Sequence, residues 1–175
     1  IRKNNINIIF ILMATSLALI NYTRTPTSDL EQYYSIFELL KEKDYVDFFL
    51  FVHLDWMFYF ISMVIVKFFN TVQATVLFWT FISYFIYFKS LELINKSYQN
   101  NNQQTLILVV LFSITMGLLF NHSSHLVREF VAVSILLYSI ILRDIDITNN
   151  KKSIIYFFIA SLIHFSAIIF LPLLF

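Results

Sequence analysis

The stretch NHSSHLVREFVAVSILLYSIIL, residues 121–142, places ionisable groups directly before a long apolar run. The apolar part is typical of a membrane-spanning helix. Arg128 and Glu129 fall in its first turn, and His122 and His125 stand just before it. Because ionisable groups are costly to place beside hydrocarbon, such a cluster at the mouth of a span is a hypothesis of function by default.

The composition of the whole chain agrees with this interpretation. Of its 175 residues, 59% are hydrophobic and only 13% are charged, and the mean hydropathy is +0.74. A water-soluble domain carries about 25% charged residues. We therefore predict a single membrane domain, an all-α polytopic bundle of transmembrane helices. The net charge of +1 gives no reason to expect a nucleic acid partner.

Missing and rare residue types exclude several kinds of site. The chain has no cysteine, which excludes disulfides, thiolate nucleophiles and zinc–thiolate centres. One glycine, Gly117, is too few for a P-loop or a dinucleotide-binding turn. On a helix, His122, His125 and Glu129 would lie on one face and could hold a metal ion, but the H-E-x-x-H spacing of zinc proteases is absent. We therefore assign no metal and no cofactor.

Apolar runs predict five membrane spans and leave one segment ambiguous. Residues 48–69 are long and apolar enough to cross, yet they contain His53 and Asp55, and hydropathy alone does not decide. The clear spans are residues 6–22, 72–88, 106–120, 127–142 and 153–171.

Loop charge favours one topology for the ambiguous segment. If residues 48–69 stay on the outer side and the N-terminus is cytoplasmic, most basic loop residues lie inside, as the positive-inside rule requires. Those residues are Arg2, Lys3, Lys89, Lys96, Arg143, Lys151 and Lys152. We therefore expect residues 23–69 to form helices at the outer face, with a sixth span over 48–69 as the alternative.

The outer segment contains one clear amphipathic helix, PTSDLEQYYSIFELLKE, residues 26–42. Ser28 and Glu31 have the spacing of a capping box at its start. Its apolar residues recur at helical period and are Leu30, Tyr33, Tyr34, Phe37 and Leu40. Such a helix suits the membrane surface.

This topology brings several ionisable side chains to one cavity that opens outward. They are Arg24, Asp29, His53, Asp55, Arg128 and His164. Arg128 is the strongest candidate, because a guanidinium binds phosphate through paired hydrogen bonds, although a long basic side chain also serves as an interfacial anchor. His164 would exchange protons or bind a diphosphate, or it is a buried imidazole bonded to a serine or a backbone carbonyl.

Two carboxylates, Asp29 and Asp55, stand near aromatic residues. Either would act as a general base or accept a hydrogen bond from a sugar hydroxyl. The alternatives are a helix-dipole partner for Asp29 and an interfacial aromatic belt around Asp55.

These motifs resemble the EpsG family of bacterial exopolysaccharide and O-antigen polymerase-like membrane proteins. In LVREFVAVSILLYSIIL and IIYFFIASLIHFSAIIFLPLL, the residues that follow the family pattern are Arg128, Ala132, His164, Ser166 and Ala167. SDLEQYYSIF and HLDWMFYFISMVIVKF resemble earlier family segments through Asp29, Tyr33 and Asp55. Glu129 departs from the glutamine usual in the family, and Ser28 departs from its glycine.

The resemblance implies a membrane glycosyltransferase in the bacterial cytoplasmic membrane. It would join polyprenyl-diphosphate-linked oligosaccharides into exopolysaccharide, capsule or O-antigen at the outer face. The resemblance implies catalytic roles for Asp29, Asp55, Arg128 and His164, and substrate contacts for Arg24, Tyr33 and His125. Membrane lipids and other polysaccharide assembly proteins are the further partners it implies.

Other classes of protein fit the same residues. A flippase or transporter of lipid-linked sugars would also place Arg and His in an outward cavity, and a non-catalytic subunit of an export system would need no site. The chain starts at Ile1 and ends at Phe175 within an apolar run, and the family has further spans. We therefore expect a piece of a longer polypeptide.

Overall fold

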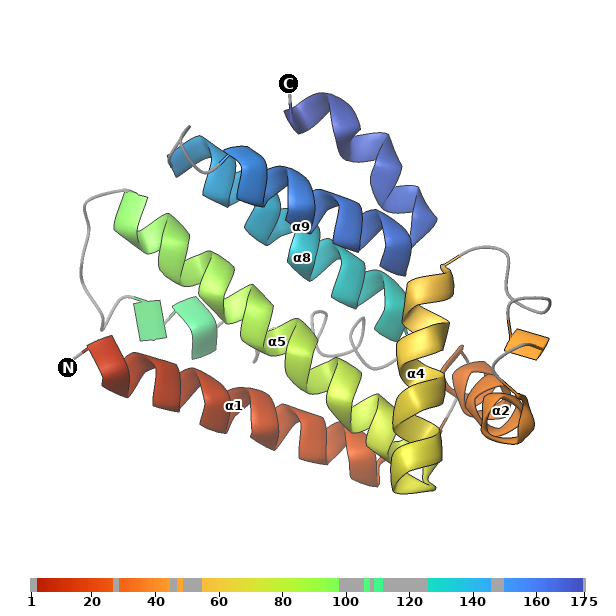
Figure 1. Ribbon diagram of the computed structural model, residues 1–175. Coiled ribbons are helices and arrows are strands. Elements are labelled where there is room, and N and C mark those ends of the chain that lie inside the picture. The colour runs from red at the N-terminus through yellow and green to blue at the C-terminus, as the bar shows by residue number, and fades with distance from the viewer. Residues whose placement is uncertain are drawn as a thin grey trace.

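The protein is a bundle of helices in which four helices, α1 (Lys3–Thr23), α5 (Val72–Ser97), α8 (Val127–Ile145) and α9 (Asn150–Ile163), lie side by side in that order. The computed structural model describes residues 3–26, 29–44, 47–48, 55–97, 106–107, 109–111, 126–145 and 150–174, and all regular structure among them is helical. Helix α1 lies beside α5, and α5 lies beside α8. Helix α8 in turn lies beside α9, as Figure 1 shows. The predicted all-α bundle is therefore confirmed for the described residues.

Two further helices cover one end of this bundle. Helix α4 (Trp56–Phe69) runs across the ends of the long helices and contacts α5 and α9, while α2 (Asp29–Glu42) packs on α4 (Figure 1). Asp55 before α4 and Asn70 after it both have a left-handed backbone, with φ of 56°. Asp and Asn tolerate that conformation better than other residues with a side chain, so the chain turns sharply at both ends of α4.

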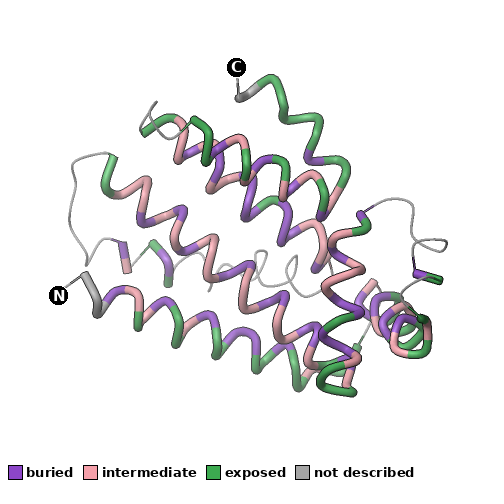
Figure 2. Tube along the Cα trace, viewed as in Figure 1, coloured by how far each residue is buried: buried purple, intermediate pink, exposed green. Residues whose placement is uncertain are grey.

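The long helices carry apolar residues on their outside as well as inside. Helix α1, over Ile6–Thr23, and helix α5 are long and apolar enough to cross a membrane. Exposed positions of α1 include Ile8, Leu12 and Leu19. Figure 2 shows that α1 has exposed positions along the side that faces away from the other helices. A surface helix of a soluble protein has polar residues there, so this surface fits lipid. Helix α4 is apolar but has only 14 residues, fewer than the roughly 20 that span hydrocarbon.

An aromatic cluster joins the end layer to the bundle. Phe58 of α4 is fully buried, and its ring stacks on Trp79 of α5 with centroids 4.9 Å apart. Tyr33 and Phe37 of α2 lie against the same ring at 5.9 and 6.0 Å. The indole N–H of Trp79 donates to Ser62, so the polar group of this buried ring has a partner within α4.

The amphipathic helix at 26–42 is confirmed as α2. The residues of its apolar face that are buried are Leu30, Tyr33, Phe37 and Leu40. Tyr34 is only half-buried, because it lies at the margin of that face. Ser28, the expected capping residue, lies outside the described residues, as do most of residues 106–120.

Two helices can be compared with the predicted spans. Helix α5 contains the predicted span 72–88 and continues to Ser97, where Lys89 and Lys96 both pair with the buried carboxylate of Glu92 at helical spacing. The segment expected as one helix over 153–171 is divided. Helix α9 ends at Ile163, and a 3-10 helix, η2 (Phe165–Leu174), follows it.

Small polar residues allow α8 and α9 to approach closely. Ser139 and Ser153 are fully buried, and each hydroxyl donates to the backbone carbonyl of the other at 2.8 Å. Small residues that hydrogen-bond between helices are a common means of association in membranes.

We predict that the close packing of α8 on α9 depends more on the size of the side chain at Ser153 than on its polarity. Ser153→Ala should lower the free energy of unfolding by about 1 kcal/mol, and Ser153→Leu by a further 1–3 kcal/mol because the larger side chain forces the helices apart. Unfolding in mixed detergent micelles measures both. Ser161→Ala is the control, because the Ser161 hydroxyl bonds within its own helix to Phe157. Equal stability of Ser153→Leu and Ser161→Ala would contradict the tight crossing.

Candidate functional site

The carboxylate of Asp55 is the centre of a buried polar cluster. Its Oδ2 atom lies 2.9 Å from Nη1 of Arg128 and 3.2 Å from Nδ1 of His164. Its Oδ1 atom accepts a hydrogen bond from the backbone N–H of Phe165. Only 7% of the Asp55 side chain is exposed, so these contacts replace the water that a carboxylate would otherwise hold.

Three helix ends bring these groups together. Asp55 directly precedes α4, Arg128 is in the first turn of α8, and His164 directly follows α9. Because α4 crosses the end of the bundle, Asp55 just before it reaches the start of α8 and the residue after α9 at the same time. The cluster therefore depends on the end layer.

Asp55 also explains why α9 stops. The N–H of His164 still bonds to the carbonyl of Ala160 in the helical pattern. The next amide, that of Phe165, donates to Asp55 instead of to the preceding turn. The N–H of Ala167 then bonds to the carbonyl of His164, which is the tighter spacing of a 3-10 helix. The carboxylate thus ends the α-helical hydrogen-bonding pattern after the His164 amide and accounts for the division of the segment at 153–171.

Arg128 is held on two sides. Its Nη1 donates to the hydroxyl of Tyr59 at 3.1 Å as well as to Asp55. The guanidinium carbon lies 5.9 Å from the centre of the Tyr59 ring, within the range of a cation–π contact. Both bonds to described residues use Nη1, while the buried Nε has no partner among these residues. The positive charge of Arg128 is therefore already opposed by one carboxylate.

A pocket of about 180 Å³ opens beside Arg128, and we call it the polar pocket. Its described lining residues are Asp29, Gln32, Tyr33, Ile36, Tyr59, Leu126, Arg128 and Glu129. Burial raises the pKa of Tyr33 from 10.0 to about 12, although the charge of Arg128 acts in the opposite direction. The phenol therefore stays neutral near pH 7 and can donate or accept a hydrogen bond in the pocket.

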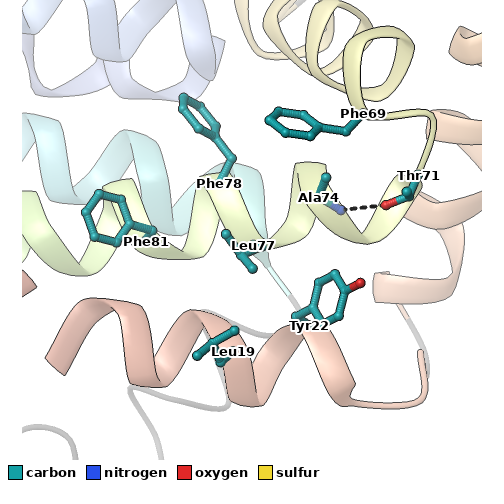
Figure 3. Close-up of a pocket in the computed structure, with 8 residues that line it drawn as sticks. All are labelled: Leu19, Tyr22, Phe69, Thr71, Ala74, Leu77, Phe78 and Phe81. Atoms are coloured by element: carbon teal, nitrogen blue, oxygen red, sulfur yellow. Dashed lines mark hydrogen bonds between the residues drawn. The ribbon is translucent and has the colours of Figure 1, made fainter. Parts of the chain in front are cut away.

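A larger pocket of about 450 Å³ lies between α1 and α5, near the C-terminal end of α4 (Figure 3). Its described lining residues are Leu19, Tyr22, Phe69, Thr71, Ala74, Leu77, Phe78 and Phe81, and none of them is charged. It has no lining residue in common with the polar pocket. Of these two pockets, only the smaller has charged side chains among its described lining residues, so the size of the larger one does not make it the better candidate for acid–base or phosphate chemistry.

Most of the predicted site residues lie together. Asp29, Tyr33 and Arg128 line the polar pocket, and Arg128 connects it to Asp55 and His164. Arg24 follows the end of α1 and is not among the described residues that line the pocket. His125, His53 and His122 lie outside the described residues.

Five lining residues were not among the predicted site residues, although four had a signal in the sequence. Tyr59 is one of the four, because it follows Asp55 at helical spacing. Gln32 and Ile36 follow Asp29 at helical spacing and share its face of α2. Glu129, weighed only as a metal ligand, lines the pocket beside Arg128. Leu126 precedes α8 and had no signal in the sequence beyond its place beside the charged pair.

The fold and the site together define a helical membrane protein with a buried Asp–Arg–His cluster at one end of its bundle. Residues 7–175 match the family model described as the EpsG family, and the chain belongs to that family. The resemblance noted in the sequence is thereby confirmed, and membership of this family suggests a role in polysaccharide biosynthesis. No curated protein and no solved structure matches the chain.

We predict strong coupling between Asp55 and Arg128. Asp55→Asn should lower the free energy of unfolding by about 3–5 kcal/mol, because it leaves the Arg128 charge buried without its counter-ion. The double variant Asp55→Asn/Arg128→Gln should lose less stability than the sum of the losses of the two single variants. The difference, which is the coupling free energy, should be about 1–3 kcal/mol. A double-mutant cycle on the unfolding free energy measures this coupling.

Glu38→Gln is the control for this cycle, since Glu38 is exposed on α2 and should change stability by less than about 0.5 kcal/mol. Hydrogen exchange adds a local readout, because the amide of Phe165 should lose protection when Asp55 is replaced. Additive losses in the cycle, together with an unchanged Phe165 amide, would refute the cluster.

Proposed function

We propose that the protein is a membrane glycosyltransferase that polymerises polyprenyl-diphosphate-linked oligosaccharides into a surface polysaccharide. The observation that carries the proposal is the polar pocket, where Asp29 and Arg128 line one space behind which Asp55 and His164 are bonded. A carboxylate beside a fixed cation is the pair that glycosyl transfer needs, since a hydroxyl loses a proton while a leaving group gains negative charge. Membership of the EpsG family supports the class of substrate.

The carboxylates of Asp29 and Asp55 have different roles in the proposed reaction. In the proposed step an acceptor hydroxyl attacks the anomeric carbon of the donor sugar, and the bond from that carbon to the diphosphate breaks. Polyprenyl diphosphate leaves with the electron pair, and the proton passes to Asp29. Asp55 is a positioning residue in this scheme, because both of its oxygens already accept hydrogen bonds and its side chain is buried.

Arg128 and His164 would meet the charge of the leaving group. The guanidinium has a forked set of donors, of which the bonds to Asp55 and Tyr59 use Nη1. Its other donors would bond the diphosphate as its charge grows. His164 keeps one ring nitrogen for Asp55, and the other would serve a phosphate oxygen or a proton. Arg24 and His125 are proposed as further contacts of the lipid-linked substrate.

The site is proposed to face the outside of the bacterial cytoplasmic membrane. In the favoured topology the N-terminus of α1 is cytoplasmic and α2 and α4 lie at the outer surface, with five crossings. Basic residues at the far end of the bundle, such as Lys89 and Lys151, fit the positive-inside rule. Membrane lipids and other polysaccharide assembly proteins are the proposed surroundings.

We predict opposite labelling of the two ends of the bundle. A cysteine at Glu38 should react with a membrane-impermeant thiol reagent in intact cells, and a cysteine at Lys151 should react only after the cells are opened. Both positions are exposed in the fold, and the chain has no cysteine of its own. Labelling of Lys151→Cys in intact cells would reverse the orientation and remove the outward site.

We predict that Asp29→Asn abolishes polymer formation while the protein remains in the membrane at normal abundance. Loss of a general base typically lowers the rate by about 10²–10⁴. Glu31→Gln is the matched control, because Glu31 stands in the same first turn of α2 but is exposed and does not line the polar pocket. The measurement is transfer from a lipid-linked oligosaccharide in isolated membranes, followed by polymer length. Normal polymer from Asp29→Asn would exclude Asp29 as the base.

The same assay separates the other classes of protein. A flippase would move the lipid-linked sugar across vesicles without forming a glycosidic bond, and a non-catalytic subunit would do neither. Transfer that depends on Asp29 distinguishes the proposed enzyme from both.

A further inference from the structure

The polar pocket presents mainly hydrogen-bond acceptors to a ligand. Asp29 and Glu129 contribute carboxylates, which accept hydrogen bonds and donate none when ionised. The cation in the lining, Arg128, is already paired with Asp55. Among the described residues no ion pair joins Asp29 or Glu129 to a basic side chain. A sugar ring that contacts these two carboxylates must therefore offer them O–H or N–H groups.

The size and the walls of the pocket fit one sugar ring. A volume of about 180 Å³ equals roughly six water molecules at about 30 Å³ each. Tyr33 and Tyr59 supply aromatic surface, and Gln32 supplies an amide that both donates and accepts. Apolar ring faces with acceptors at the margin match a pyranose, which has C–H faces and hydroxyls around its edge.

We propose that the polar pocket is a specificity site that accepts a neutral or amino sugar and rejects an acidic one, with Glu129 and Asp29 as the selecting residues. This inference rests on the proposed function, because it names the sugar that the enzyme takes at that site. An ammonium or hydroxyl group bonds to the two carboxylates. A uronic acid brings a third carboxylate into the same small space, where like charges repel, whereas the diphosphate of the donor is proposed to meet the remaining donors of Arg128.

Helix dipoles offer a simpler account of the two acids, and the experiment separates it. Asp29 lies in the first turn of α2 and Glu129 in the first turn of α8, where a carboxylate is stabilising without any ligand. Glu31 also lies in the first turn of α2 but is exposed and outside the polar pocket. If the dipole were the whole explanation, Glu31 and Glu129 would have the same effect on sugar binding.

The test compares three probes on the intact protein in lipid nanodiscs: protonated glucosamine, methyl glucoside and glucuronate. Saturation-transfer NMR titrations give their relative affinities. We expect glucosamine to bind about tenfold more tightly than glucuronate, with methyl glucoside between them, since one charge-assisted hydrogen bond is worth about that factor. Glu129→Gln should bring the ratio close to one, Asp29→Asn should shift it in the same direction, and Glu31→Gln should leave it unchanged.

Three results would overturn the inference: glucuronate that binds as tightly as glucosamine, equal shifts from Glu129→Gln and Glu31→Gln, or no binding of any probe. Thermal melting of each variant identifies loss of folding, and Asp29→Asn keeps the test open if Glu129→Gln does not fold. Binding of these probes needs no lipid-linked donor. A preference with no transfer activity would refute the proposed function alone, while transfer without the preference would refute this inference alone.

Discussion

The buried carboxylate of Asp55 is the contact on which the end of the bundle depends. A negative charge with 7% of its side chain exposed is stable only with close partners, and Asp55 finds them in Arg128, in His164 and in the amide of Phe165. These partners lie in α8 and at the junction of α9 and η2, which the chain reaches long after α4, since His164 lies 109 residues beyond Asp55. The contacts of Asp55 with these partners hold α4 across the bundle and end α9. They also position Arg128 beside Tyr59. Packing of Phe58 on Trp79 stabilises the same arrangement from the apolar side.

The cluster separates two carboxylates that look alike in the sequence. Asp55 is bonded through both oxygens and is buried, so its role is to hold Arg128 and His164 in position. Asp29 lines the polar pocket with Glu129, where a ligand can reach it. A sugar in that pocket would meet acceptors first and the guanidinium only at one side. On the proposed function, this difference between the two carboxylates would give the pocket both a candidate base and a means of choosing its substrate by charge.

The rest of the bundle uses polar groups sparingly, as a membrane requires. Ser139 and Ser153 bond across α8 and α9, and Asn21 donates to Thr80 between α1 and α5 at 2.9 Å. Each of these bonds satisfies a group that lipid could not solvate. Ionisable side chains in the described residues gather near the helix ends, such as Glu92 with its two lysines and the cluster around Asp55. The exposed apolar residues of α1 agree with a protein whose long helices face lipid and whose buried polar cluster lies at one end of the bundle.

The sequence by itself determined the membrane class, the all-α fold and the residues that carry charge. Composition and helical periodicity report these directly, because the bilayer demands apolar helices and makes every ionisable residue conspicuous. The apolar face of α2 was predictable for the same reason. Only the tertiary structure decided which charges meet. Hydropathy could not foresee that Asp55 would intercept the amide of Phe165 and end α9, or that Arg128 would be paired with a carboxylate instead of standing free. Those outcomes depend on contacts between residues far apart in the chain, and a local pattern carries no information about them.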